Sequence, residues 1–137
     1  MTSRVVYNGE LRTTATHLRS GSVIETDAPV DNQGKGERFS PTDLVATALA
    51  SCLLTTIAII GKGHNLNIDG AVCDVTKVME SAPRRIAEIE ITISFPMSNG
   101  YTDKEKKLIE RIAETCPVAL SLHPDLKQSL TFNWPNG

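Results

Sequence analysis

Short alternating runs of hydrophobic and polar residues begin the chain. Alternation with a period of two, bounded by turn residues, is typical of strands. The runs are Arg4–Tyr7, Arg12–His17 and Val23–Asp27, with turn residues between them at Asn8-Gly9 and Ser20-Gly21. Pro29–Phe39 is polar and contains glycine, which is typical of a loop. The pattern therefore predicts three short strands and a loop before residue 40.

A long run without charge follows, and its start has the signals of a helix. Ser40 is a good N-cap, Pro41 suits the first helical position, and Asp43 stands where a capping-box acid would stand. Leu44–Gly61 contains no charged residue, and the length of this run is about the lower limit for a membrane span. The run contains Ser and Thr, is the only such stretch, and is flanked by strand patterns, so we expect no membrane insertion. A helix apolar all round is instead predicted to be buried, by a sheet and by a partner subunit.

The next segment contains the clearest strand signal of the chain. Ala87–Phe95 alternates strictly, and Leu66–Met79 alternates in part. Ser81-Ala82-Pro83 separates them as a turn, so the two segments are predicted to form a hairpin.

The last third of the chain predicts two helices and a final strand. Thr102 and Glu105 form a capping box that opens a helix, and Cys116-Pro117 breaks it. Val118–Leu122 then predicts a short helix, and Leu130–Trp134 a strand. The order of elements predicts an α+β fold with a mainly antiparallel sheet, in a single domain that spans residues 1–137.

Composition excludes several function classes. The net charge is −2 and aromatic residues are 4% of the chain, so nucleic acid is not an expected partner. The start of the sequence lacks a signal-peptide pattern, which predicts a cytoplasmic protein whose three cysteines stay reduced. Without Cys-x-x-Cys, His-x-x-x-His or a glycine-rich phosphate loop, we expect neither a metal nor a cofactor.

Cys52 and Cys116 are the candidate functional residues. Cys52 lies in the charge-free helix, on the face opposite to Asp43, and Cys116 lies at a helix break where free backbone N–H groups favour a thiolate. If the fold brings the two segments together, the protein has a buried dithiol. Either cysteine alone is also consistent with a role as a small core residue. Cys73 lies in the middle of a predicted strand, and we interpret it as structural.

The contexts of the two cysteines resemble the OsmC/Ohr family, the osmotically inducible and organic-hydroperoxide-resistance proteins. The matching segments are S-P-T-D-L-V-A-T-A-L-A-S-C, which ends at Cys52, and E-T-C-P-V-A-L-S-L around Cys116. The order of the intervening strands fits as well, so the resemblance covers nearly the whole chain.

This resemblance implies an OsmC-like fold with a long buried central helix, in an intertwined homodimer with two sites at the subunit interface. It implies a thiol peroxidase for organic hydroperoxides, with Cys52 as the peroxidatic thiol and Cys116 as the resolving one. A disulfide between them would then be reduced by an external dithiol, in the family typically of the lipoyl type.

The family also uses an Arg and a Glu to hold the peroxidatic cysteine as thiolate, and here the sequence departs. Thr42 occupies the position of that Glu, directly after the helix-start Pro. Arg38 is the candidate for the Arg, and Arg19 is a second one; Glu37 is a possible partner of Arg38. The departure suggests a divergent branch. It leaves open an alternative function, a dimeric module that binds a small hydrophobic or thiol-reactive ligand without turnover.

Overall fold

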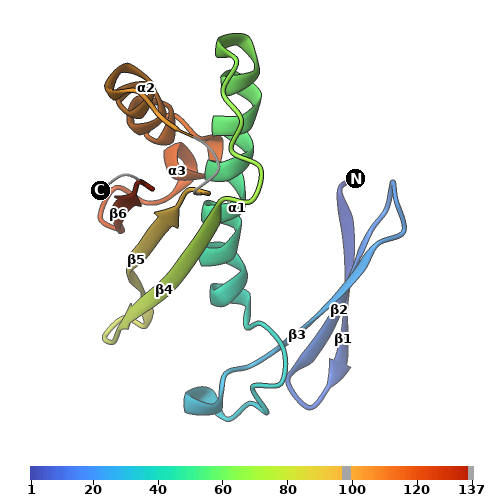
Figure 1. Ribbon diagram of the computed structural model, residues 1–137. Helices are drawn as coiled ribbons and strands as arrows, with labels where there is room; N and C mark the ends of the chain where they lie inside the picture. The colour runs from blue at the N-terminus through green and yellow to red at the C-terminus, as the bar shows by residue number, and fades with distance from the viewer. Residues whose placement is uncertain (97–99, 136–137) are drawn as a thin grey trace. The chain divides into compact units, whose positions relative to one another are not determined.

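The computed structural model describes residues 1–96 and 100–135, and the chain forms two compact units, Met1–Val45 and Ala46–Gly137. The elements are β1 (Ser3–Gly9), β2 (Arg12–His17), β3 (Val23–Asp27), the 3-10 helix η1 (Val30–Asn32), α1 (Pro41–Gly61), the 3-10 helix η2 (Lys62–His64), β4 (Val72–Glu80), β5 (Arg85–Ser94), α2 (Asp103–Ala113), α3 (Pro117–Ser121) and β6 (Lys127–Asn133) (Figure 1). The predicted α+β class is confirmed.

The N-terminal unit is a three-stranded antiparallel sheet in the order β1-β2-β3. The predicted bounds of β2 and β3 are confirmed, and β1 is slightly longer than predicted. The turn between β1 and β2 places Gly9, Glu10 and Leu11 at positive φ. A glycine is favoured at the first of these because it adopts that conformation without strain.

A buried ion pair joins this sheet to the loop that follows it. Asp27 is 1% exposed, and its two carboxylate oxygens accept hydrogen bonds from Nε and Nη2 of Arg12 at 2.6 and 2.8 Å. The Glu37 N–H donates to the same carboxylate at 3.1 Å, and the Asp27 N–H donates to the Phe39 carbonyl at 3.2 Å. The loop is therefore anchored at its far end by one carboxylate, a contact that the sequence pattern did not predict.

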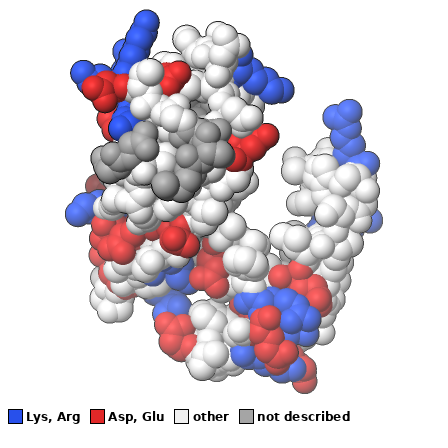
Figure 2. Space-filling view, in the orientation of Figure 1, with Lys and Arg blue, Asp and Glu red and all other residues white. Residues whose placement is uncertain are grey.

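Charges of both signs surround this loop. Lys35 pairs with Glu10 at 3.0 Å, and Arg38 pairs with Glu25 at 3.3 Å. In the view of Figure 2, basic and acidic side chains accordingly lie interspersed around the N-terminal unit. Such mixed charge offers a polyanion no continuous basic surface on this face.

The C-terminal unit contains a sheet in the order β4-β5-β6. β4 and β5 form the predicted antiparallel hairpin, whereas β6 pairs with β5 in parallel. The parallel pairing follows from the connection, because α2 and α3 carry the chain back to the starting end of β5. Three of the four strand pairings are antiparallel, as the prediction of a mainly antiparallel fold requires.

The strand predicted to begin at Leu66 begins only at Val72. The Leu66 N–H donates instead to the Gly61 carbonyl at 2.9 Å, and the Ala71 N–H donates to the Ile68 carbonyl at 2.8 Å. These bonds use the backbone groups of the segment to end the helix and to form a turn. Apolar spacing alone did not reveal this local competition.

The core of the C-terminal unit is built on the alternation of β5. Ile89, Ile91 and Ile93 are 0–1% exposed, which confirms the face predicted for this strand. They belong to one hydrophobic cluster with residues of both long helices, namely Leu49, Leu53 and Ile57 of α1 and Ile109, Ile112 and Ala113 of α2.

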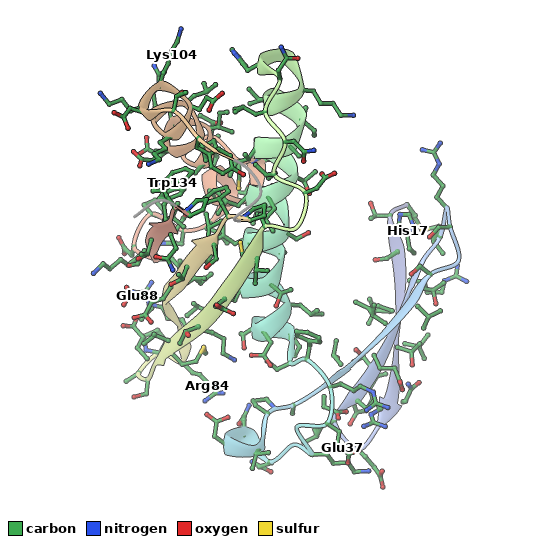
Figure 3. The ribbon with its side chains drawn as sticks, viewed as in Figure 1. His17, Glu37, Arg84, Glu88, Lys104 and Trp134 are labelled. Atoms are coloured by element: carbon green, nitrogen blue, oxygen red, sulfur yellow. The ribbon has the colours of Figure 1, made fainter. Side chains whose placement is uncertain are left out.

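An aromatic group closes one end of this core. Trp134, labelled in Figure 3, stacks on Phe95 with ring centroids 4.4 Å apart. Tyr101 lies edge-on to Phe95 at 5.4 Å, and the Lys106 ammonium lies 5.6 Å from the centroid of the Trp134 ring. Trp134 is the only tryptophan of the chain, so its fluorescence reports on this core.

Helix α1 differs from its prediction in burial. Leu49, Leu53 and Ile57 are buried, but Ile59 is 65% exposed and Ile60 is 38% exposed. The single chain thus covers one face of a helix that was predicted to be buried on all sides. Pro41–His64 is long and apolar enough to cross a membrane by length and composition, a test that core helices of soluble proteins also pass.

We predict that Ile91→Ala lowers the free energy of unfolding by about 2–5 kcal/mol, because it leaves a cavity between β5 and the helices. Urea unfolding followed by Trp134 fluorescence measures the loss. Val72→Ala is the control, since Val72 is 53% exposed on the neighbouring strand. The free energy of unfolding of this variant is expected to fall by less than about 1 kcal/mol. Equal losses in the two variants would contradict the assignment of the core.

Candidate functional site

Cys52 lies on α1, whose start is fixed by reciprocal capping. The Asp43 N–H donates to the Ser40 hydroxyl at 3.0 Å, and the Ser40 N–H donates to the Asp43 carboxylate at 2.9 Å. The expected cap role of Asp43 is therefore confirmed. Cys52 is partly buried and packs against the hydrophobic core. One helical turn further on, the Thr56 hydroxyl lies 3.9 Å from its sulfur.

Cys116 lies at the junction of α2 and α3. The predicted capping box of Thr102 and Glu105 starts α2, and Cys116 is the N-cap of α3 with Pro117 as the first helical residue. Its side chain is fully buried, and its sulfur accepts a hydrogen bond from the Ala119 N–H at 3.3 Å. The helix break predicted at Cys116-Pro117 is thus the start of α3, which the Cys116 thiol caps.

The fold brings the two cysteines together, Cys52 from α1 and Cys116 from the start of α3, the two helices labelled in Figure 1. The Cys116 thiol and the Val118 N–H of α3 lie close enough to the Cys52 sulfur to act on its ionisation as donors. Both cysteines are free thiols. The site is therefore a reduced dithiol in which one sulfur receives hydrogen bonds from the other and from the backbone of α3.

The two thiols differ in their acidity. Burial alone would raise the pKa of Cys52, but hydrogen bonds from the Val118 N–H, the Cys116 thiol and the Thr56 hydroxyl outweigh it and lower that pKa. Burial raises the pKa of Cys116, and the interaction of its thiol with the Cys52 sulfur raises that pKa further. Cys52 is thus the thiol that ionises first.

This order corrects one expectation. The break at Cys116-Pro117 was expected to favour a thiolate on Cys116, whereas the backbone of α3 favours the thiolate on Cys52. The reason is that Cys116 is fully buried, while Cys52 receives donors from two elements. Thr56 and Val118 were not recognised as parts of the site. The spacing of Thr56, four residues after Cys52, was the one available signal.

Cys73 lies outside this pair. It is half-buried on β4, opposite Ile93 of β5, and burial together with the neighbouring Asp74 raises its pKa to about 11. A thiol of this kind stays protonated and unreactive at neutral pH.

The sequence-predicted arginines belong to the N-terminal unit. The Arg38 guanidinium donates to the Glu25 carboxylate at 3.3 Å and to the Glu37 carbonyl at 3.0 Å, and Arg19 is exposed between β2 and β3. Thr42 lies in the first turn of α1, with its hydroxyl 3.2 Å from that of Ser40. Their roles toward Cys52 stay predictions.

Within residues 1–96 and 100–135, no group of three or more His, Cys, Asp or Glu side chains is placed to hold a metal ion.

These features define a class, an α+β protein with a dithiol between a core helix and the capped start of a short helix. The sequence model of the OsmC-like protein family matches residues 34–130. The chain belongs to this family, which confirms the resemblance seen in the sequence. No protein with a curated record is similar enough to be counted as a relative.

Solved structures resemble the chain along nearly its whole length. A protein from Psychrobacter arcticus, described as an osmotic stress induced and detoxification response protein, is 52% identical, with 97% of this chain and 96% of that chain covered and a TM-score of 0.92. The organic hydroperoxide resistance protein OsmC of Legionella pneumophila is 14% identical, with 97% of each chain covered and a TM-score of 0.76. An organic hydroperoxide resistance protein from Elizabethkingia anophelis is 18% identical, with 97% and 96% covered and a TM-score of 0.69. The last two similarities show the fold alone.

We predict that Thr56→Val slows the alkylation of Cys52 by iodoacetamide at pH 7 by about two- to fivefold, because one hydrogen bond to the thiolate is lost. The thiolate fraction rises with pH, so the rates of variant and wild type converge at high pH. Peptide mapping over a pH series measures this profile.

Thr55→Val is the matched control, because the Thr55 hydroxyl donates to the Ser51 carbonyl at 2.8 Å instead of to the sulfur. An unchanged profile in Thr56→Val would show that the hydroxyl does not act on Cys52.

Proposed function

We propose that this protein is a thiol-dependent peroxidase that reduces organic hydroperoxides through Cys52 and Cys116. The observation that carries the proposal is the pairing of a partly exposed thiol of lowered pKa with a fully buried thiol of raised pKa. The family membership supports it, as do the names of the Legionella and Elizabethkingia proteins.

The proposed reaction has two steps. The Cys52 thiolate attacks one peroxide oxygen, the O–O bond breaks, and the alkoxide leaves as an alcohol after taking a proton, which leaves a sulfenic acid on Cys52. The Cys116 sulfur then attacks the sulfenic sulfur, and a disulfide forms as water leaves. The electrostatic coupling of the two thiols supports this second step, because it requires the resolving sulfur to lie near the first. An external dithiol, of the lipoyl type by family resemblance, returns the disulfide to two thiols by exchange.

The proposal includes a homodimer in the cytoplasm. Apolar side chains are exposed in both units, among them Ile59 of α1, and Val5 and Ile24, which lie on one face of the N-terminal sheet in register with Ala15. Surfaces of this kind are typical of protein interfaces. A second copy is the occupant that the family resemblance implies.

A second candidate function is ligand binding without turnover. It is favoured by a cavity of about 600 Å³ between α2, α3 and β6, whose lining is apolar at Ala113, Leu130 and Phe132 and polar at Glu110, Glu114 and Gln128. A small ligand with an apolar body fits a cavity of this size and lining.

We predict that one equivalent of cumene hydroperoxide converts Cys52 and Cys116 to a disulfide faster than hydrogen peroxide does. Intact mass would fall by two hydrogens, and peptide mapping would place the bond. Cys52→Ser should abolish hydroperoxide consumption, whereas Cys116→Ser should stop at a sulfenic acid that over-oxidises. Cys73→Ser is the control and should react as the wild type does. Two unreacted thiols would overturn the peroxidase and favour the ligand-binding candidate.

A separate experiment tests the arginines. We predict that Arg38→Met lowers the rate of hydroperoxide consumption at pH 7 by about tenfold or more, as the loss of one positioned donor in a reactive site typically does. Arg19→Met is measured beside it as the second candidate. A loss in Arg19→Met alone would reassign the role to Arg19, and wild-type rates in both would remove arginine from the mechanism.

A further inference from the structure

Helix α3 is too short to be stable by itself. It contains five residues, and isolated helices of that length do not form in water. The Cys116 sulfur accepts from the Ala119 N–H at its start, and the Ser121 hydroxyl donates to the Pro117 carbonyl at 2.8 Å. Both bonds are local, so neither fixes where the helix lies relative to the sheet. Leu120 is 72% exposed, so the helix packs on the core only through its other side, with Val118, Ala119 and Leu122.

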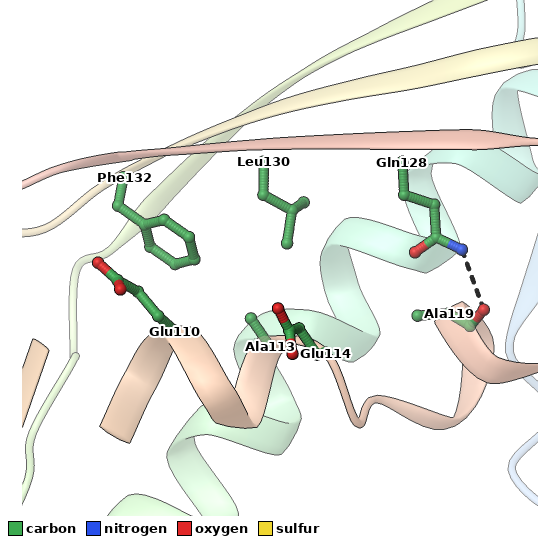
Figure 4. Close-up of a pocket in the computed structure, with 7 residues that line it drawn as sticks. All are labelled: Glu110, Ala113, Glu114, Ala119, Gln128, Leu130 and Phe132. Carbon is green, nitrogen blue, oxygen red and sulfur yellow. Dashed lines mark hydrogen bonds between the residues drawn. The ribbon is translucent and has the colours of Figure 1, made fainter. Parts of the chain in front are cut away.

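One side chain from the sheet supplies a longer link. Gln128 of β6 donates from Nε2 to the Ala119 carbonyl at 3.0 Å (Figure 4), and both residues line the cavity. The Ala119 carbonyl is one of the last four of the helix, which have no partner inside α3. Gln128 thus satisfies a carbonyl that the helix itself cannot use, and it joins α3 to the strand next to β5.

The two preceding peptide N–H groups of α3 face the dithiol. The Ala119 N–H donates to the Cys116 sulfur at 3.3 Å, and the Val118 N–H lies close enough to the Cys52 sulfur to lower its pKa. A shift of α3 by a few tenths of an ångström would lengthen both bonds together. The position of these two donors therefore depends on the bond at the Ala119 carbonyl.

We infer that Gln128 is a positioning residue for the dithiol, which holds the N–H groups of Val118 and Ala119 against the sulfurs of Cys52 and Cys116 through the Ala119 carbonyl. The inference rests on the proposed function, because it names what prepares Cys52 for attack on a hydroperoxide. Gln128 itself touches neither sulfur in this arrangement, and it acts through α3.

Gln128→Met tests the inference, because Met has nearly the length of Gln and lacks the donor. We expect the alkylation of Cys52 by iodoacetamide at pH 7 to slow by about three- to tenfold, with convergence toward the wild-type rate at high pH. Hydrogen exchange at Val118 and Ala119 should speed up, while the amides of α2 keep their wild-type protection. A pH profile that superimposes on that of the wild type would overturn the proposal.

Ser129→Ala is the matched control on the same strand. The Ser129 hydroxyl donates to the Glu88 carboxylate at 2.5 Å, so the variant also removes a hydrogen bond of β6 to another element. Its alkylation profile should equal that of the wild type. An equal slowing in Ser129→Ala would assign the effect to loosening of the strand and would overturn the role of Gln128.

Trp134 fluorescence shows whether Gln128→Met folds. If it does not, a measurement on the wild type tests the inference instead. The side-chain amide resonance of Gln128 should shift with pH at the same midpoint as the thiol of Cys52, because the two ends of α3 are coupled. A side-chain amide that does not respond to that titration would overturn the inference. Neither readout uses a peroxide, so a failure of the proposed peroxidase would show separately, in the absence of hydroperoxide consumption by the wild type.

Discussion

The row of isoleucines on β5 is the constraint on which the C-terminal unit depends. Ile89, Ile91 and Ile93 must be kept from water, and each fully buried aliphatic side chain of this size contributes roughly 1.5–3 kcal/mol relative to its exposed state. Side chains of α1 and α2 cover that row. Once they pack on it, the chain must return to the starting end of β5, which gives β6 its parallel partner. The meeting of Cys52 and Cys116 is a result of this packing, since each lies on an element that the core has already placed.

A few hydrogen bonds determine the chemistry of this thiol pair at the edge of the hydrophobic core. Burial opposes ionisation of both sulfurs, so the balance is decided by which sulfur receives more donors. Cys52 receives three, from α1, from the N-cap thiol and from the backbone of α3. Burial and these hydrogen-bond donors are therefore what distinguishes the two thiols.

Local signals in the sequence predicted the parts of the structure that local interactions decide. The capping pairs of Ser40 with Asp43 and of Thr102 with Glu105, the alternation along β5 and the break before Pro117 all form as expected. The errors arose where hydrogen bonds compete in ways that apolar spacing does not show, once within a helix end and once between two helices. The Leu66 N–H bonds back to Gly61 instead of to a strand, and the thiolate is favoured on Cys52 because Val118 reaches across from another helix. The contact of Arg12 with Asp27 joins residues of two different strands, and neither local pattern predicted it.

That contact gives the two units different responses to acid. The Arg12 guanidinium lowers the pKa of Asp27 against the effect of its burial, so the folded N-terminal unit binds a proton there less readily than the unfolded chain does. Its stabilising effect is present above the ordinary pKa of an aspartate and is lost as the pH falls through the lowered value. The hydrogen bond from the Glu37 N–H to this carboxylate is weakened with it, whereas the backbone bond from Asp27 to Phe39 does not depend on the carboxylate. The isoleucine core of the other unit carries no such charge, and so an acidic medium loosens the hairpin sheet and its loop while the packing around the dithiol remains.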